Sequence, residues 1–366
     1  KMNYKTMYKD KLSKMLFLEI NKEAFFKSIN MPQDIKLKND DLYIPISSEY
    51  VANNATDEIR IHNLPIYYFI EGMFMAFGAD KNLRFNDDYG CILSYIDDSE
   101  QCIKSIIADK VKKNELEDAY ILSKGLYRYT NDQEVMEAVL SIGEAIREEN
   151  KSFSELLLED IEECKEKFDH NPKPYLYSAL ICRDDSDYKK AQVEINEYIN
   201  KGGKRTNEIE VIMNDINNIG NYEKAIEIVN DEPEKAITLL LPLHEQFEKN
   251  PLIYYYLAVA YRKLENYDKA IYYLLESLQI ESGILEVVNE LGLNYACVHN
   301  YEEAVKYFKK AFEASNEVGI CTNIVMCYIN LGDKEQAKEY LEKAKKIDSS
   351  DEIVIELDQM LNRAVK

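Results

Sequence analysis

The stretch Tyr267-Asp-Lys-Ala270 belongs to a motif that recurs along the chain: an aromatic residue, two charged residues and an alanine. The other copies are Tyr188-Lys-Lys-Ala191, Tyr222-Glu-Lys-Ala225, Tyr301-Glu-Glu-Ala304 and, without the tyrosine, Lys334-Glu-Gln-Ala337. Successive alanines are 34, 45, 34 and 33 residues apart, and such a period is typical of repeat architectures. The longest spacing equals 34 plus 11, about three helical turns. We therefore predict a block inserted near 226–236 that preserves the helical phase, with Ala236 preceding Ala270 by 34 residues.

Each of the last three units contains two apolar stripes with the spacing i, i+3, i+4, i+7, separated by a polar turn. This spacing predicts pairs of helices. Small residues, Ala258 or Gly292 on the first helix and Ala270 or Ala304 on the second, should let the two backbones cross closely. Larger tyrosine, leucine and phenylalanine side chains should fill the spaces between successive pairs.

The pattern resembles the tetratricopeptide repeat family, most clearly over 251–350, where three consecutive units keep the small and the aromatic positions. The closing proline of the family pattern is absent, and Ser282, Asn316 and Ser349 stand in its place. The resemblance implies an all-α fold in which helix-pair repeats stack as a right-handed superhelical solenoid.

The remaining segments extend this solenoid or cap it. Degenerate repeats of the same kind are predicted over 100–250, and a C-terminal capping helix over 351–366. Residues 1–99 do not follow the period and predict a helical N-terminal module, since the end of a solenoid needs a cap. Within this module the sequence predicts a long amphipathic helix over 3–29, a loop over 30–45, a helix from Pro65 to near Gly78, and a helix over 86–96.

Composition and charge narrow the classes of function. The chain has 366 residues and a formal net charge of −22, which argues against general binding of nucleic acid or anionic lipid. Its longest apolar run, 252–261, is shorter than the ~20 residues of a membrane span. Seven cysteines without a C-x-x-C motif fall inside helical apolar patterns, which favours small core residues in a reducing cytoplasm. Abundant Lys, Asn, Ile and Tyr, with no Trp, indicate an AT-rich bacterial genome.

The sequence contains no pattern typical of a catalytic or metal site. None of the four histidines, His62, His170, His244 and His299, lies four residues from another, and none accompanies paired cysteines. Phosphate-binding loops, dinucleotide fingerprints and nucleophile elbows are also absent from the sequence. We therefore predict no metal, no cofactor and no enzymatic activity.

In the family that this chain resembles, the first helix of each pair lines an inner groove that meets the ligand. Carried over by position, the groove candidates are Leu252, Tyr255, Val259, Arg262, Asn289, Leu293, Thr322 and Met326, with Ala296 and Ile329 beside them. The lysines and asparagines with which some family members grip a terminal carboxylate are missing, because Tyr255, Val259 and Glu290 occupy such positions. The alternative is that Val259, Leu293 and Met326 simply pack inside a tightly wound superhelix.

The interpretation that best fits these patterns is a non-enzymatic, cytoplasmic adaptor or scaffold. It would bind a protein or peptide segment in the groove, with Tyr255 as an aromatic anchor and Arg262 and Asn289 as polar contacts. The net charge favours a partner with basic character. One alternative is a bacterial peptide-sensing regulator in which residues 1–99 form an effector module. An enzyme within residues 1–99 is a third reading, disfavoured by the lack of a catalytic constellation.

Overall fold

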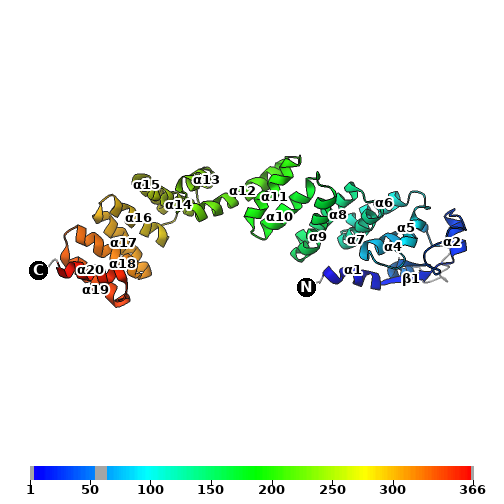
Figure 1. Cartoon of the computed structure of the whole chain (residues 1–366), viewed down its shortest axis with the longest axis horizontal. Helices are drawn as coiled ribbons and strands as arrows, with labels where there is room; N and C mark the ends of the chain where they lie inside the picture. Colours follow the sequence, from blue (N-terminus) through cyan, green and yellow to red (C-terminus); the bar gives the residue numbers. More distant parts are fainter. Residues whose placement is uncertain (1–3, 54–63, 364–366) are drawn as a thin grey trace. The chain divides into compact units, whose positions relative to one another are not determined.

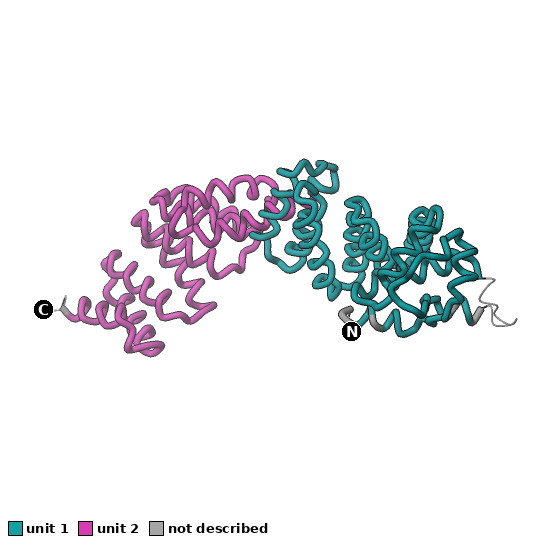
Figure 2. Tube along the Cα trace, turned by 45° about the vertical axis from the view of Figure 1, so that its right-hand side comes forward, with its two compact units in different colours: residues 1–210 teal, residues 211–366 magenta. Residues whose placement is uncertain are grey.

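The computed structural model describes residues 4–53 and 64–363. The chain forms two compact units, residues 1–210 (unit 1) and 211–366 (unit 2), which Figure 2 shows in different colours. The boundary falls inside one helix, α12 (Asn207–Ile228). The finer division predicted from the repeat pattern stays a prediction.

The described part of unit 1 is helical apart from two short strands (Figure 1). Its first elements are α1 (Tyr4–Ser13), β1 (Met15–Glu19), α2 (Lys22–Ser28), β2 (Tyr43–Ser47), α3 (Ser48–Asn53), α4 (Ile66–Ala79) and α5 (Asn86–Leu93). The next are α6 (Ser99–Lys112), α7 (Leu116–Thr130), α8 (Gln133–Glu149), the 3₁₀ turn Lys151–Phe153, α9 (Ser154–Lys167), α10 (Lys173–Asp184) and α11 (Tyr188–Asn200). The helix predicted after Pro65 is confirmed as α4, and the helix predicted over 86–96 is present as α5 but ends at Leu93.

The single helix predicted over 3–29 is wrong. The structure has α1, β1 and α2 in its place, and the loop predicted over 30–45 ends in β2. Ile44 and Ile46 of β2 are fully buried, and β-branched side chains suit a strand. A short apolar run such as the one in β1 fits either a helix or a strand, so pairing with the distant β2 determines that it forms a strand. The antiparallel register pairs Met15 with Ser47, Phe17 with Pro45 and Glu19 with Tyr43.

Helix α4 packs unusually closely against its neighbours because glycines let backbones touch. Gly72 lies against the backbone of Pro45 in β2. Gly78 and Gly125 meet where α4 packs on α7, and a Cβ added at Gly125 would overlap the carbonyl oxygen of Phe74. The N-terminal elements are therefore fixed to α7 by backbone contact as well as by side chains.

One continuous hydrophobic core runs through unit 1 from Met7 to Ile181. Beside it, the guanidinium of Arg147 is almost fully buried and donates to the carboxylates of Glu144 and Asp184, each at 2.7 Å. A buried charge is tolerated only when it is paired. Although burial opposes it, hydrogen bonds from Lys151 and Arg147 hold the pKa of Asp184 below its usual value. The core and this ion-pair network join several helix pairs into one body.

Unit 2 consists of helix pairs that follow one another in chain order (Figure 1). After α12, its elements are α13 (Pro233–Gln246), α14 (Pro251–Lys263), α15 (Tyr267–Ile280), α16 (Leu285–Cys297), α17 (Tyr301–Ser315), α18 (Val318–Asn330), α19 (Lys334–Ile347) and α20 (Glu352–Arg363). The pairs α14/α15, α16/α17 and α18/α19 make the most extensive helix contacts of the unit. The predicted stacking of helix pairs is confirmed.

The turn inside each of these pairs is built in the same way. A residue with positive φ (Glu265 or His299) precedes an asparagine whose side chain accepts a hydrogen bond from the amide three residues later. Asn266 and Asn300 are these N-caps, and they satisfy amide groups that the helix itself leaves unpaired. Before α19 the same arrangement uses Gly332, which has a positive φ, and the N-cap Asp333. The capped turn fixes where the second helix of each pair begins.

The small residues of the repeats lie at close helix contacts, as predicted, but with one difference in detail. Ala270 and Ala304 are fully buried. A Cβ added at Gly292 would lie 2.6 Å from the ring of Phe308, so Gly292 makes room for this ring, where an alanine partner was predicted.

The prediction that the block near 226–236 preserves the helical phase is wrong, whereas the predicted position of Ala236 as a repeat alanine agrees with its burial. The motif Tyr222-Glu-Lys-Ala225 lies inside α12, which ends at Ile228, and a turn precedes α13. Pro233 occupies the first turn of α13, a position that proline favours. Ala236, fully buried on α13, therefore takes the place of the repeat alanine.

The hydrophobic core of unit 2 is divided into smaller clusters of buried residues, each formed by neighbouring helices. One of them joins Ala258 of α14 to Leu274 of α15 and Leu291 of α16. Another joins Phe308 of α17 to Ile324 of α18. Each helix pair thus contacts mainly the pair before it and the pair after it, as in other solenoids.

Candidate functional site

The predicted groove residues lie on α14, α16 and α18, the first helices of three successive pairs. They differ widely in exposure. Leu252 and Met326 are 40% and 47% exposed, whereas Val259 and Thr322 are 7% and 1% exposed and belong to the packing. The other four, Tyr255, Arg262, Asn289 and Leu293, are half-buried. Contact with a ligand through the side chains of Val259 and Thr322 is therefore blocked in this structure.

Arg262 of α14 and Glu290 of α16 form an ion pair between neighbouring repeats, through Arg262 Nε and Glu290 Oε1. Glu290 is only 5% exposed. Asn294, one turn further along α16, is fully buried and donates from Nδ2 to the backbone oxygen of Glu290 at 2.8 Å. The sequence prediction placed Arg262 in the groove but missed its partner. The two residues are 28 residues apart, which matches neither the helical period nor the 34-residue repeat, so the sequence carries no signal for this pair.

The polar cluster also affects Tyr255. Burial, and then the nearby carboxylate of Glu290, raise the pKa of Tyr255 to about 12, so its phenol stays protonated and able to donate. Within the described residues, the side-chain oxygens of Asn289 and Asn294 are buried without a hydrogen-bond partner. Buried polar atoms normally have one. This face therefore offers a half-buried aromatic side chain near the ion pair of Arg262 and Glu290, whereas fully buried Asn294 is out of reach of a ligand.

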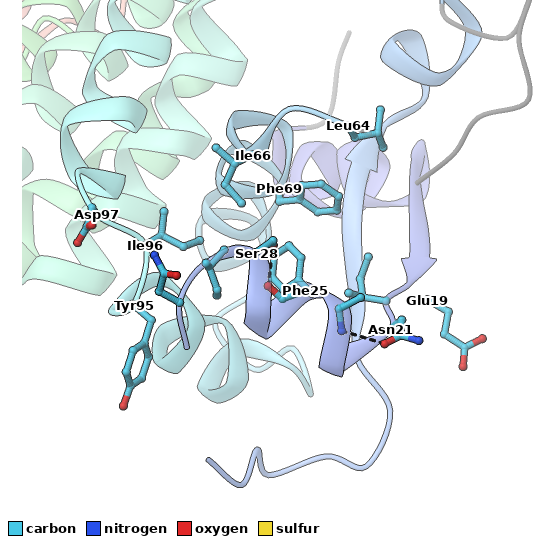
Figure 3. Close-up of a pocket in the computed structure, with 14 residues that line it drawn as sticks. Glu19, Asn21, Phe25, Ser28, Leu64, Ile66, Phe69, Tyr95, Ile96 and Asp97 are labelled. Carbon is cyan, nitrogen blue, oxygen red and sulfur yellow. Dashed lines mark hydrogen bonds between the residues drawn. The ribbon is translucent and has the colours of Figure 1, made fainter. Parts of the chain in front are cut away.

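Unit 1 contains a separate pocket of about 810 Å³ that sequence reasoning missed (Figure 3). Phe25 of α2 and Phe69 of α4 form part of its wall, with ring centroids 5.3 Å apart. Two of its polar side chains are already used locally: Asn21 accepts from the amide of Ala24, and Ser28 donates to the carbonyl of Phe25. The pocket therefore lies where α2 packs against α4.

Metal ligands do not gather anywhere in residues 4–53 and 64–363: no group of three or more His, Cys, Asp or Glu side chains could hold an ion there. His62 lies outside the described residues. No helix among those described has both the length and the apolar character needed to cross a bilayer.

The prediction that the cysteines are core residues holds for only some of them. Cys321 and Cys327 are buried, and burial raises the pKa of each thiol to about 11. Cys297 is exposed, because it occupies the last turn of α16, where the chain leaves the packed face. All seven cysteines are free thiols.

The stacked, capped helix pairs and the partly exposed face along their first helices define a helical-repeat protein. Residues 251–283 and residues 318–351 each match a family model described as tetratricopeptide repeat. The chain therefore contains tetratricopeptide repeats, which are modules of protein–protein interaction scaffolds. None of the curated proteins compared with it gives a match.

Solved structures with a similar arrangement of helices share little sequence with this chain. A MamA protein is 17% identical over 48% of this chain and 90% of its own, with a TM-score of 0.37. PilW, a type IV pilus biogenesis factor, is 15% identical over 62% of this chain and 97% of its own, with a TM-score of 0.36. YrrB, a tetratricopeptide repeat protein with an unusual peptide-binding site, is 15% identical over 65% of this chain and 97% of its own, with a TM-score of 0.29.

Proposed function

We propose that this protein is a non-enzymatic adaptor whose face on α14, α16 and α18 binds a segment of a partner protein. Tetratricopeptide repeat proteins bind protein or peptide partners, and a solenoid offers a long surface formed before binding. The observation that carries the proposal is the cluster at α14 and α16, where half-buried Tyr255 lies near the ion pair of Arg262 and Glu290. The protonated phenol of Tyr255 would donate to a main-chain carbonyl of the partner.

The partner we propose has basic character. The whole chain carries a net charge of −22, which speeds encounter with a basic partner. On the groove face, Glu290 already neutralises Arg262, so this arginine adds little repulsion toward a cation. The seven free thiols support a cytoplasmic location, where thiols stay reduced.

The experiment is a pull-down with the full chain, identification of captured proteins by mass spectrometry, and affinity measurement with the partner's interacting segment. Tyr255→Ala should weaken binding by about 1–2 kcal/mol, because aromatic anchors carry a large share of interface energy. Tyr272→Ala is the matched control, since Tyr272 is an exposed tyrosine on α15, the second helix of the same pair.

The proposal fails if both variants bind the partner as well as the unmodified chain does. A triple variant, Tyr255→Ala, Arg262→Ala and Asn289→Ala, makes the test more stringent. Full binding by this variant would move the interaction away from α14 and α16. Circular dichroism of each variant establishes that the helices remain intact before affinities are compared.

A further inference from the structure

A second, polar pocket of about 750 Å³ lies within unit 1, at the C-terminal end of α4. It shares no residue with the face on α14, α16 and α18, and it does not depend on the function proposed for that face. Five carboxylates and three basic side chains are among its lining residues. Those that matter most are Asp80, Asn86, Lys124, Arg128 and Glu159.

Asn86, on the first turn of α5, gives this pocket a buried acceptor. The residue is 7% exposed. Its Nδ2 donates to the backbone oxygen of Asp80 at 2.7 Å, which fixes the orientation of the amide and makes Oδ1 the acceptor. That oxygen has no hydrogen-bond partner anywhere in the described chain. Because buried polar atoms are rarely left unsatisfied, we expect Asn86 Oδ1 to accept a hydrogen bond from a bound ligand.

The two basic side chains on α7 are already engaged. Lys124 Nζ lies 2.6 Å from Asp160 Oδ1, and both side chains are largely buried. Arg128 Nη1 donates to the carbonyl oxygens of Phe77 and Gly78 near the end of α4. The C-terminus of a helix carries partial negative charge, so the protein's own guanidinium demonstrates that this end of α4 attracts a cation.

Among the described residues, two carboxylates at the pocket lack an ion-pair partner, and they outnumber the third basic side chain, exposed Lys81. Glu159 of α9 is exposed and has no ion-pair partner among the described residues. Asp80 is also exposed, and its Oδ1 accepts only from the amide of Asn82, at 2.9 Å. A ligand with N–H donors and positive charge would meet both the buried acceptor and these carboxylates. An anionic ligand would meet neither.

We propose that this pocket binds a protonated amine or a guanidinium, with Asn86 Oδ1 as the buried acceptor and Glu159 and Asp80 as the neutralising carboxylates. The cationic group comes either from a basic side chain of a protein partner or from a free polyamine. The same chemistry recognises both.

The test is isothermal titration calorimetry of the full chain with two probes: spermidine, and a short peptide with blocked ends that contains two lysines. Asn86→Ala should weaken binding of the preferred probe by about tenfold, since it removes a hydrogen bond to a charged group. Glu159→Gln should weaken it by a few-fold without touching the packing, because Glu159 is exposed. Glu166→Gln is the matched control, since Glu166 is exposed on α9 two turns from Glu159 and does not line the pocket.

Tighter binding of the peptide assigns the site to a partner's side chain, and tighter binding of spermidine assigns it to a free amine; either supports the proposal. Any one of three results would overturn the proposal. The first is that neither probe binds at millimolar concentration. The second is that Glu166→Gln weakens binding as much as Glu159→Gln, and the third is that a folded Asn86→Ala variant binds as tightly as the unmodified chain. Melting curves show whether Asn86→Ala is folded, and Glu159→Gln keeps the test decisive if it is not.

Discussion

Gly125→Ala should destabilise unit 1, because the place of an added methyl is already occupied by backbone. A Cβ at Gly125 would overlap the carbonyl oxygen of Phe74 and lie 3.2 Å from the amide nitrogen of Gly78. A backbone carbonyl cannot swing away as the end of a side chain can, so α4 and α7 must move apart. Overpacking typically costs about 1–3 kcal/mol, and the better helix propensity of alanine returns at most about 1 kcal/mol. Taking the upper half of this range for a clash with backbone, we expect a net loss of about 2 kcal/mol.

The matched control for this change is Gly90→Ala. A Cβ at Gly90, within α5, would meet only the ring of Phe77, at an ordinary contact distance of 3.6 Å. It should therefore raise stability by about 0.5–1 kcal/mol through helix propensity alone.

Thermal unfolding followed by circular dichroism, with hydrogen exchange of peptides from α4 and α7, measures both variants. For a unit of this size, 1 kcal/mol shifts the midpoint by about 2–4 °C, so Gly125→Ala should lower it by about 4–8 °C. Peptides from unit 2 provide the internal reference. A Gly125→Ala protein at least as stable as Gly90→Ala would refute the close backbone packing of α4 on α7.

Three further predictions concern other parts of the chain. Ala304→Leu should cost about 1–3 kcal/mol in thermal unfolding, because Ala304 is fully buried at a helix contact, and an unchanged melting curve would contradict this. Asp184→Asn should destabilise the chain at neutral pH. The folded-state pKa of Asp184 lies below its usual value, so the ionised carboxylate stabilises the folded chain above about pH 4. This contribution is lost as pH falls further. The two unfolding curves should then converge in acid, and a constant gap would show that Arg147 does not depend on this charge. Under native conditions a thiol reagent should label exposed Cys297 well before Cys164, whose pKa is raised to about 12 by burial, and equal labelling rates would count against this packing.

The repeat period made most of unit 2 predictable, because each helix pair repeats the same local signals. A buried alanine such as Ala304 and an asparagine N-cap such as Asn300 lie within a few residues of the turn that they define. Such signals need no knowledge of distant contacts. The helix after Pro65 was predictable for the same reason, since a proline at a helix start acts locally. Asn86 lies at the start of α5 but does not cap it, because the N-cap is Phe85 and makes no side-chain hydrogen bond.

The errors arose where distant residues decide the structure. β1 becomes a strand because it pairs with β2, about 25 residues later in the chain, and its own apolar run does not specify that partner. In α12 the tetrapeptide beginning at Tyr222 resembles the start of a repeat helix, yet the chain turns only before Pro233. The position of the proline, rather than the motif, determines where the next helix begins.

The position of each groove candidate on its helix was predictable, but its exposure and contacts were not. Helical spacing placed Tyr255 and Arg262 on the first helix of a pair. Whether a given side chain is exposed depends on the neighbouring repeat, and this is why Thr322 is buried while Met326, one turn later, is exposed. The partner of Arg262, Glu290, belongs to the following pair, so helical periodicity within one helix could not identify it.

The division of the unit 2 core into small clusters has a mechanical consequence. The large core that spans Met7 to Ile181 in unit 1 favours all-or-none unfolding of the helices it joins. Clusters shared only by adjacent pairs instead let strain spread as many small rotations between neighbours. Unit 2 should then behave like a spring whose stiffness falls as repeats are added in series. A partner lying along α14, α16 and α18 would meet a surface that adjusts its curvature without breaking any one cluster.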